Sequence, residues 1–250
     1  MSDDVPDDHP RAASLRARER LVEGVAAGIT SQHGLIAHGR GEALDYLIGE
    51  ETIPSAADAA RAAAAAMVLA DHPVISVNGN VAALAPDETV ALADALDAPI
   101  EVNLFHRTEE RVTAIADHLR AHGASTIYGA GPDARIPGLA HDRAKVHEAG
   151  IYSADVVLVP LEDGDRAEAL GAMGKTEVVV DLNPLSRSSQ TASIPICDNV
   201  LRALPAITEA VGELRGRPTS ETEAVRDAFD ADAAREAAVE AIRTGDLESV

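Results

Sequence analysis

The 250-residue chain has few aromatic residues, a single cysteine and no long apolar run. Aromatic residues make up 2 % and tryptophan is absent, so we expect a core of Ala, Val, Leu and Ile. Cys197 alone cannot form an internal disulfide, which is typical of a reducing cell interior. No apolar run approaches the roughly 20 residues that span a bilayer, and the acidic N-terminus lacks the regions of a signal peptide. We therefore expect a soluble, cytoplasmic protein with no membrane contact.

Basic residues are also scarce. Lys and Arg total 21 against 42 Asp and Glu, so the net charge is −21, and Lys145 and Lys175 are the only lysines. Such a charge repels phosphates at long range and argues against binding to nucleic acids. It favours a salt-loving origin, with molar salt inside the cell to screen the self-repulsion; an ordinary acidic protein with an acidic tail is the alternative. Any anionic substrate must then be held by locally placed Arg, His or backbone N–H groups.

From residue 73 onward, short apolar strands alternate with amphipathic helices. This alternation predicts an α/β fold with a parallel sheet covered by helices on both faces. The expected strands are Pro73–Val77, Ile100–Phe105, Ser125–Tyr128, Asp155–Leu161, Glu177–Leu182 and Ile194–Cys197. The expected helices are Asp87–Leu96, Thr108–His122, His141–Ala149, Asp165–Met173 and Leu201–Leu214.

Helices are also expected at both ends of the chain. The N-terminal helical part, residues 1–70, should contain a helix over Ala12–Ile29, a glycine-rich link over Gly34–Gly41, a short helix to Ile48 and an Ala-rich helix from Ser55. Together with the sheet over residues 73–215, it should form one domain. Beyond residue 216, Glu221–Ile242 predicts an appended surface helix, with a disordered acidic tail as the alternative.

Polar residues follow the long strands, where open α/β sheets bind their ligands. Turns also favour Asn and Asp, so the stronger signal is that Arg, Asn and acidic residues occur together at one edge of the sheet. The clusters are Asn78-Gly79-Asn80, Asn103 to Thr108 with His106 and Arg107, Glu162 to Arg166, Asp181 to Ser189, and Asp198-Asn199.

The stretch from Asp181 to Ser189 is the most suggestive of these clusters. Asp181 at a strand end can accept hydrogen bonds from ribose hydroxyls or hold a metal ion. Arg187 and Ser188 are expected to open a helix and can bind phosphate through side chains and free N–H groups. The alternative is a capped loop with Arg187 in solvent. Neither a Gly-x-Gly-x-x-Gly fingerprint nor a P-loop motif is present.

A second suggestive stretch is His38-Gly-Arg40-Gly-Glu42. Its glycines would let the backbone approach a ligand closely, while His38 and Arg40 supply positive charge. The alternative is a turn between helices with a solvated Arg40. Scattered histidines and the absence of a cysteine cluster argue against a zinc site, and we expect no metal held by the protein alone.

Long stretches of the chain resemble the archaeal 4-phosphopantoate–β-alanine ligases, also called archaeal phosphopantothenate synthetases. The resemblance covers about His9 to Leu214 and excludes the tail from Gly216. The similar stretches are HPRAASLRARERLVEG from His9, GLIAHGRGEALDYLIGE from Gly34, PVISVNGNVAAL from Pro73, EVNLFHRTEER from Glu101, ADVVLVPLEDGDRAEALGAMGK from Ala154, DLNPLSRSS from Asp181 and ICDNVLRALP from Ile196.

The resemblance implies a Rossmann-like homodimer that makes 4′-phosphopantothenate, AMP and diphosphate from ATP, 4-phosphopantoate and β-alanine, on the way to coenzyme A. Two departures are Ala12, where relatives often have an aromatic residue, and His106, where Tyr is common; the second puts the acid-substrate pocket in doubt. The ATP-contacting positions that the resemblance implies are Arg18, Arg40, Asp181, Leu182, Asn183, Arg187, Ser188, Asp198 and Asn199.

The implied chemistry requires charge stabilisation on phosphates more than a covalent role for the protein. Arg18, Arg40 and Arg187 are the candidates for clamping phosphate, with Mg²⁺ bridging the phosphates. We expect Arg40, Arg187 and His38 to act in catalysis. The substrate's own phosphate would be held by Arg107, by His38 and by the turn of Asn78, Gly79 and Asn80.

Two other classes of function remain open from the residues alone. One is a different nucleotide-dependent enzyme on the same architecture, a dehydrogenase or a transferase, against which the missing glycine fingerprints argue. The other is a regulatory module that binds a nucleotide without turnover.

Overall fold

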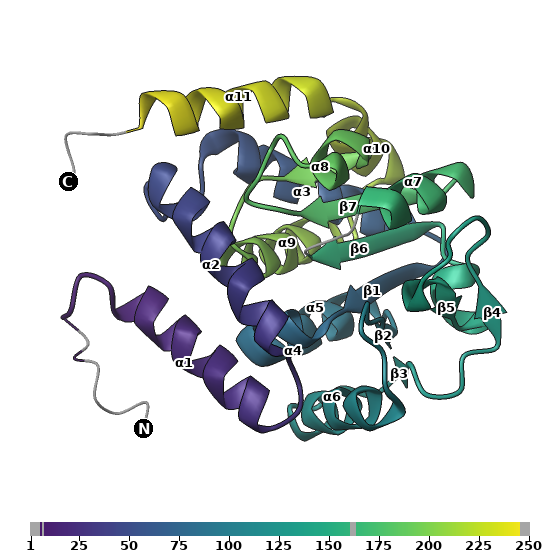
Figure 1. Cartoon of the computed structure of the whole chain (residues 1–250). Coiled ribbons are helices and arrows are strands. Elements are labelled where there is room, and N and C mark those ends of the chain that lie inside the picture. Colours follow the sequence, from purple (N-terminus) through teal and green to yellow (C-terminus); the bar gives the residue numbers. More distant parts are fainter. Residues whose placement is uncertain (1–5, 7, 161–163, 246–250) are drawn as a thin grey trace.

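The computed structural model describes residue 6 and residues 8–160 and 164–245, which form an α/β fold (Figure 1). Six strands make one parallel sheet, as the sequence predicted, and their order is β3-β2-β1-β6-β7-β8. A separate antiparallel pair consists of β4 and β5. The strands are β1 Pro73–Val77, β2 Ile100–Val102, β3 Ile127–Tyr128, β4 Ala134–Arg135, β5 Lys145–Val146, β6 Val156–Pro160, β7 Thr176–Val180 and β8 Ile194–Ile196.

Helices surround the sheet and extend beyond it at both ends of the chain. In the part of the chain that the structure describes, no helix has the length and apolarity to cross a membrane. The helices are α1 Ala12–Ala26, α2 Gln32–Leu47, α3 Pro54–Leu69, α4 Gly79–Leu84, α5 Pro86–Leu96, α6 Glu109–Ala121, α7 Gly164–Ala172, α8 Arg187–Thr191, α9 Val200–Leu214, α10 Thr219–Asp227 and α11 Ala231–Thr244.

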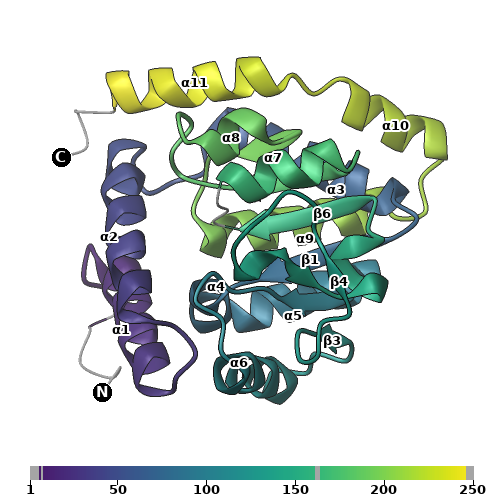
Figure 2. The ribbon, with the colours of Figure 1, turned by 45° about the vertical axis from the view of Figure 1, so that its right-hand side comes forward.

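The strands bury side chains on both faces of the sheet, because neighbouring residues of a strand point in opposite directions. In β1, Ile75 and Val77 belong to the larger apolar core, together with residues of α3 and α9. Val74 belongs to a smaller core on the other side, with Leu170 of α7 and Ile151. Figure 2 shows α9 and α7 with the strands between them. The helical cover expected on both faces is therefore present.

The Ala-rich helix α3 lies deep in the fold. Ala59, Ala63 and Ala65 have no exposed surface. Their short side chains let neighbouring helices approach closely, and α3 packs against α9, α10 and α11. Pro54 stands in its first turn, where a missing N–H costs nothing, so the helix begins one residue before the expected cap Ser55.

The link predicted over Gly34–Gly41 is wrong. This glycine-rich stretch forms the middle of α2. Close packing explains one of its glycines. A Cβ atom on Gly34 would collide with the side chains of Asn80 and Thr30. Gly39 has open space around it, so this position does not require glycine for packing. The glycines therefore indicated correctly that the backbone lies close to other residues, but they predicted a link where the structure has a helix.

The C-terminal segment forms two packed helices instead of the single expected helix. α10 and α11 are separated at residues 228–230, and the Asp230 side chain caps α11 by accepting from the backbone N–H of Ala233 at 3.0 Å. Thr222 and Ala238 are buried. Both helices contact α3, so the described part of this segment is ordered and packed; residues 246–250 lie outside the described residues.

The helix predicted over His141–Ala149 is wrong. The segment begins with a short 3-10 turn at Asp142–Ala144, continues as β5, and enters a π-helical turn at Glu148–Tyr152. Long-range hydrogen bonds impose this path. The buried carboxylate of Glu101 on β2 accepts from the backbone N–H groups of His147, at 3.1 Å, and Ile151, at 2.7 Å.

Several strands end earlier than predicted because their last residues serve the loops. β2 ends at Val102, and the Asn103 side chain turns to donate to the carbonyls of Arg143 and Lys145, at 3.2 and 3.1 Å. β7 ends at Val180, one residue before Asp181. After β1 the chain enters the short helix α4, where only a turn was expected. The predicted last strand residue Leu161, with Glu162 and Asp163, lies outside the described residues.

Candidate active site

The sheet has a topological switch point between β1 and β6. From β1 the chain builds outward through β2 and β3, then returns to β6 on the other side of β1 and continues to β7 and β8. Open sheets with this order bind ligands in the crevice beyond the carboxyl ends of the strands. Here the Asn78 side chain joins the two ends by donating to the Pro160 carbonyl at 3.0 Å.

A cavity of about 580 Å³ lies at this edge of the sheet, within the size range of small-molecule sites. Its walls come from the α1–α2 segment, from the loops after β1, β2 and β7, and from single residues of α6 and of the segment before β5. The lining residues are Thr30, Ser31, His33, Gly34, Ala37, Arg40, Gly41, Leu44, Asn78, Gly79, Asn80, Leu104, Phe105, His106, Arg111, Arg143, Asp181, Leu182, Asn183, Ser186 and Ser188.

The charge of the cavity is opposite to that of the chain. Its lining includes three arginines, Arg40, Arg111 and Arg143, and one acid, Asp181, so its formal charge is 3 − 1 = +2. The whole chain carries −21. A concave, partly desolvated wall strengthens the attraction of such a cluster for anions. The cavity is therefore suited to a phosphorylated ligand.

The loop after β7 is pre-organised around Asp181. The Ser186 hydroxyl donates to one carboxylate oxygen of Asp181 at 2.6 Å, and the backbone N–H of Asn183 donates to the other at 3.0 Å. Burial raises the pKa of Asp181, while these hydrogen bonds and the positive charge of Arg40 act to lower it. Ser186 also caps α8, through a bond from the Ser189 N–H. The loop thus presents a fixed carboxylate and a helix start, as the sequence predicted.

α2 brings Arg40 to the cavity but turns His38 elsewhere. Arg40 forms no hydrogen bond or ion pair with any other described residue, and its positive charge acts on Asp181, which lines the same cavity. His38 does not line the cavity. Burial lowers the pKa of His38, with Glu42 opposing and Arg18 assisting, and its buried Nε2 lacks a partner among the described residues. Only Arg40 of this predicted pair faces the ligand space.

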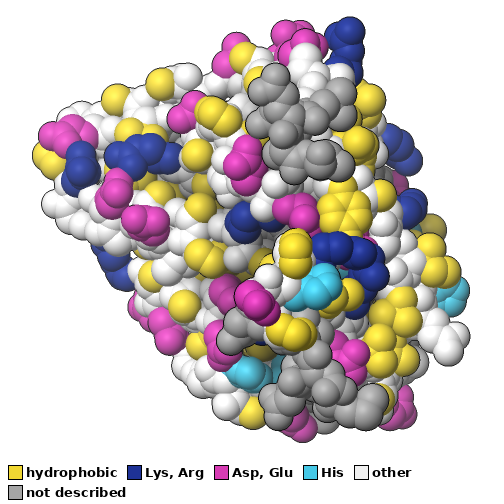
Figure 3. All heavy atoms as spheres, turned by 90° about the vertical axis from the view of Figure 1, so that its left-hand side faces the viewer, with side chains coloured by type: hydrophobic (Ala, Val, Ile, Leu, Met, Phe, Trp, Pro, Cys, Tyr) yellow, Lys and Arg dark blue, Asp and Glu magenta, His cyan; other side chains and the backbone are white. Residues whose placement is uncertain are grey.

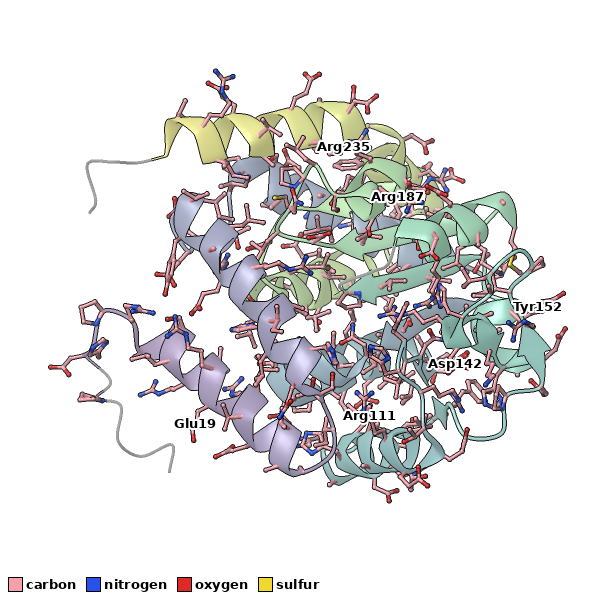
Figure 4. The ribbon with its side chains drawn as sticks, in the orientation of Figure 1. Glu19, Arg111, Asp142, Tyr152, Arg187 and Arg235 are labelled. Carbon is pink, nitrogen blue, oxygen red and sulfur yellow. The ribbon has the colours of Figure 1, made fainter. Side chains whose placement is uncertain are left out.

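Two other predicted phosphate ligands, Arg18 and Arg187, form ion pairs at the surface instead of lining the cavity. Arg18 on α1 binds both carboxylate oxygens of Glu42 on α2, with nitrogen–oxygen distances of 2.8 to 3.0 Å. Arg187, at the start of α8, pairs with Glu168 of α7 at 2.8 Å, and its side chain is 65 % exposed. Figure 4 labels Arg187 beside α7 and Arg111 near α6, with the sheet between them. Each ion pair raises the pKa of its arginine.

Asp198 and Asn199 also lie outside the cavity, in a buried polar network. Asp198 accepts from the Thr52 hydroxyl at 2.6 Å and from Arg202 Nε at 2.8 Å. Asn199 caps α9 and donates to Asp45 of α2 at 2.8 Å, and Arg202 Nη2 pairs with Asp45 at 2.5 Å. Burial raises the pKa of Asp198. The network joins the end of β8 to the helix that carries Arg40.

The stretch of Asn78, Gly79 and Asn80 lines the cavity, but its side chains are engaged in structure. Asn78 caps α4 by accepting from the N–H groups of Asn80 and Val81. Asn80 accepts from the Thr30 hydroxyl and donates to the Gly34 carbonyl at 2.9 Å, which ties α2 to the sheet. A Cβ on Gly79 would collide with the Ile29 carbonyl. These residues therefore shape the cavity wall.

Arg107, the predicted ligand of the substrate phosphate, turns away from the cavity. Its buried side chain donates to the Gly129 carbonyl at 2.5 Å and pairs with Glu109 at 3.0 Å. Arg111, four residues later, lines the cavity and was missed, as was Arg143. The available signal was that Arg111 lies four residues after Arg107, in the first turn of the predicted helix. No such signal was available for Arg143, because the sequence predicted a helix over its segment and that helix does not form.

A pair of histidines at the end of α6 also escaped the sequence analysis. His118 and His122 are four residues apart, with ring centroids 4.6 Å apart, and His122 pairs with Asp87 at 2.6 Å. They line a separate hollow of about 340 Å³ between α1 and α6. Across the ranges that the structure describes, no group of three or more His, Cys, Asp or Glu residues is arranged to hold a metal ion.

The doubly wound sheet, with a cationic cavity across its switch point, defines the class of α/β enzymes that act on nucleotides and other anionic substrates. Residues 55–245 match the model of the phosphopantothenate/pantothenate synthetase family, and the chain belongs to that family. The match includes α10 and α11, so the expectation that the resemblance stops before Gly216 is wrong.

Curated relatives carry one shared name, 4-phosphopantoate–beta-alanine ligase. The protein of Thermococcus kodakarensis is 60 % identical over 212 residues, which cover 84 % of this chain and 81 % of the relative. That of Methanosarcina mazei is 59 % identical over 212 residues, covering 85 % and 83 %. That of Thermococcus onnurineus is 55 % identical over 227 residues, covering 90 % and 87 %.

Proposed function

We propose that this protein is an ATP-dependent ligase that condenses 4-phosphopantoate with β-alanine to give 4′-phosphopantothenate, AMP and diphosphate, a step toward coenzyme A. The observation that carries this proposal is a cavity of charge +2 at the switch point of an acidic chain that belongs to this family. ATP and 4-phosphopantoate are polyanions, so both require such a local reversal of charge. The names of the relatives agree with this reaction.

The reaction proceeds in two balanced steps. A carboxylate oxygen of 4-phosphopantoate attacks the α-phosphorus of ATP, and the bond to diphosphate breaks, which leaves a phosphopantoyl-adenylate. The amine of β-alanine then attacks the activated carbonyl carbon, the bond to AMP breaks and the amine loses its proton. Both steps place negative charge on phosphate oxygens, where fixed positive groups lower the barrier.

Arg40 is our main candidate for this electrostatic role. It lines the cavity and has no hydrogen bond or ion pair within the described ranges, so it meets phosphate without first losing a partner. Asp181 is placed to accept from ribose hydroxyls, while Leu182, Asn183 and Ser188 line the same side.

Arg18 and Arg187 can join the site only by exchanging partners. Their present partners are the carboxylates of Glu42 and Glu168, and a nucleotide phosphate would have to replace them. His38 lies beside the Arg18–Glu42 pair, and we assign it to the same rearrangement, with no contact to the substrate in the present arrangement.

Asp198 and Asn199 act, in our proposal, by holding α2 in place. Their bonds through Arg202 and Asp45 fix the helix five residues beyond Arg40. Mg²⁺ would enter with ATP and be held by its phosphates and water, with Asp181 as the available carboxylate of the lining.

The decisive experiment is nucleotide turnover in molar KCl with Mg-ATP, 4-phosphopantoate and β-alanine, each omitted in turn. AMP and 4′-phosphopantothenate should appear only with all three present. Formation of ADP in place of AMP would still support a ligase, but it would indicate an acyl phosphate intermediate in place of the adenylate. A folded protein without turnover would contradict the proposal and leave a nucleotide-binding module.

The role of Arg40 has its own test. Arg40→Ala should lower kcat/KM by roughly 10²-fold, the usual cost of removing a group that stabilises transition-state charge. Arg61→Ala removes an exposed arginine that pairs with Glu213, outside the cavity, and should retain full activity. Equal activity of the two variants would remove Arg40 from the mechanism.

We also propose that the protein is a homodimer that pairs through α1 and α2. The supporting observation is that these helices carry four exposed large apolar side chains, Val22, Ile36, Tyr46 and Leu47. Among the sixteen residues of α2, only Asp45 is buried within one chain. The face formed by these helices mixes apolar and charged side chains (Figure 3). Ile36→Asp should convert the dimer to a monomer in light scattering, whereas a dimer that persists would place the interface elsewhere.

The proposed setting is the cytoplasm of a haloarchaeon. A net charge of −21 with only two lysines supports it, because molar KCl screens the self-repulsion of such a surface. The free energy of unfolding should rise between 0.1 and 2 M KCl. A protein that is equally stable at both salt concentrations would contradict a halophilic origin.

A further inference from the structure

Arg111 is a cation without an acidic partner in a chain that has twice as many acids as bases. No carboxylate among the residues with described positions forms an ion pair with it. Burial is the single cause that shifts the pKa of Arg111, and it lowers that pKa, with no acid to oppose it. A half-buried guanidinium is costly unless a negative group meets it. The missing counter-charge points to an anionic ligand.

The hydrogen bonds of Arg111 hold it at the cavity wall. It rises from the first turn of α6, where Nη1 donates to the His106 carbonyl at 2.6 Å and Nη2 to the Ile29 carbonyl at 3.3 Å. Nε is buried and has no acceptor in the described part of the chain. These bonds fix the guanidinium between the loop after β2 and the end of α1, so its position is set before a ligand arrives. Figure 4 labels it near α6.

A second guanidinium and two imidazoles share this end of the cavity. Arg143 is buried, and its segment is anchored by the bond from the Asn103 side chain to the Arg143 carbonyl. The rings of His33 and His106 lie 5.2 Å apart. Every other charged residue of the lining, Arg40 and Asp181, comes from α2 or from the loop after β7.

The two ends of the cavity are therefore chemically distinct. The loop after β2 and the loop after β7 are separated by two strands, β1 and β6. Three strand spacings amount to about 14 Å, enough for two ligands side by side across the switch point. The Asp181 end offers a carboxylate and hydroxyls, which suit a nucleoside. The Arg111 end offers cations and ring N–H groups, which suit a phosphate monoester.

We propose that Arg111, assisted by Arg143, binds the phosphate group of the acid substrate and so makes the enzyme selective for the phosphorylated acid. This inference rests on the proposed ligase function. It directs the substrate's phosphate to the β2 end and its carboxylate to the switch point, toward the nucleotide. Arg111 thus takes the role that the sequence suggested for Arg107, whose guanidinium is engaged with Gly129 and Glu109.

Selectivity between two acids tests this assignment. We would measure kcat/KM for 4-phosphopantoate and for pantoate, which lacks the phosphate, in the wild type and in Arg111→Gln. A charge-assisted hydrogen bond corresponds to a factor of about 10 to 10² in affinity. The preference for the phosphorylated acid should fall by that factor, through KM for 4-phosphopantoate, with KM for ATP within about twofold of the wild type. Arg120→Gln removes an exposed arginine of the same helix and should change neither value.

Because Arg111 also donates hydrogen bonds to the His106 and Ile29 carbonyls, its replacement can disturb the fold, and two further measurements are needed. Arg111→Lys keeps the charge, so it should retain most of the preference if the phosphate is the target. If Arg111→Gln does not fold, ³¹P NMR of 4-phosphopantoate bound to the wild type decides, since a guanidinium lowers the second pKa of a phosphate monoester. An unchanged preference in a folded Arg111→Gln, or an unshifted phosphate pKa, would overturn the assignment. Wild-type protein without ligase turnover would refute the proposed function instead, so the two failures are distinguishable.

Discussion

Glu101 should make the stability of this protein depend on pH. Its carboxylate lies on β2, is 1 % exposed and is held by the N–H groups of His147 and Ile151. Burial raises the pKa of Glu101 from 4.5 to about 7, against the two hydrogen bonds and the charges of Arg166 and Arg107. In the folded protein the group therefore binds its proton at a pH where the unfolded chain has lost it.

The sign and size of the effect follow from proton linkage. A raised folded-state pKa stabilises the fold fully below pH 4.5, and this contribution is lost as the pH rises through 7. Each pH unit between these values changes the free energy of unfolding by about 1.4 kcal/mol. A difference of about 2.5 units gives roughly 3 kcal/mol, a large part of the stability of an ordinary domain.

The assay is denaturant unfolding in molar KCl at several pH values between 5 and 8, for the wild type and for Glu101→Gln. The variant should lose stability at every pH, because Gln can accept only one of the two N–H bonds, but the part of the slope due to Glu101 should vanish. Glu109→Gln changes an exposed glutamate and should leave the slope intact. Parallel curves for the wild type and Glu101→Gln would refute the reasoning.

Three further outcomes are expected. Arg202→Gln leaves Asp45 and Asp198 buried without their cation, so it should lower the free energy of unfolding by about 3–5 kcal/mol in denaturant unfolding. The control Arg226→Gln changes an exposed arginine and should alter that free energy by no more than about 0.5 kcal/mol. Equal losses in the two variants would show that the network does not stabilise the fold. Gly34→Ala forces α2 away from Asn80 and should lower kcat/KM more than Gly39→Ala, which has open space, and equal kinetics would contradict the packing argument. Burial raises the pKa of Cys197 to about 12, so its thiol should resist alkylation at pH 8 until the protein unfolds, and rapid labelling of folded protein would show the site to be open.

The parallel sheet was predictable because its signal is local. Alternating apolar strands and amphipathic helices are visible in short windows, and helices such as Thr108–His122 differ from α6 by only a residue at each end. The segment 141–149 was not predictable from such windows. Its path depends on Glu101, some 46 residues away along the chain, whose carboxylate takes the N–H of His147.

The site was predictable only in part, for a related reason. Sequence position identified the loops that meet at the cavity, and Arg40, Asp181, Leu182, Asn183 and Ser188 do line it. Spacing could not tell which way an arginine points. Arg107 and Arg111 are four residues apart, yet the first donates to the Gly129 carbonyl and the second lines the cavity. The choice depends on tertiary acceptors that no local pattern contains.

The strong negative charge of the chain makes an arginine without an acidic partner unusual. Across the described residues, most arginines have an acidic partner, as Arg18, Arg187 and Arg202 do. A guanidinium that faces the cavity without such a partner, as Arg40 and Arg111 do, is conspicuous in this setting. In molar salt, long-range attraction is screened within about 3 Å, so a substrate is held only by groups in direct contact. The unpaired arginines at the two ends of the cavity are therefore the residues on which substrate affinity should depend most.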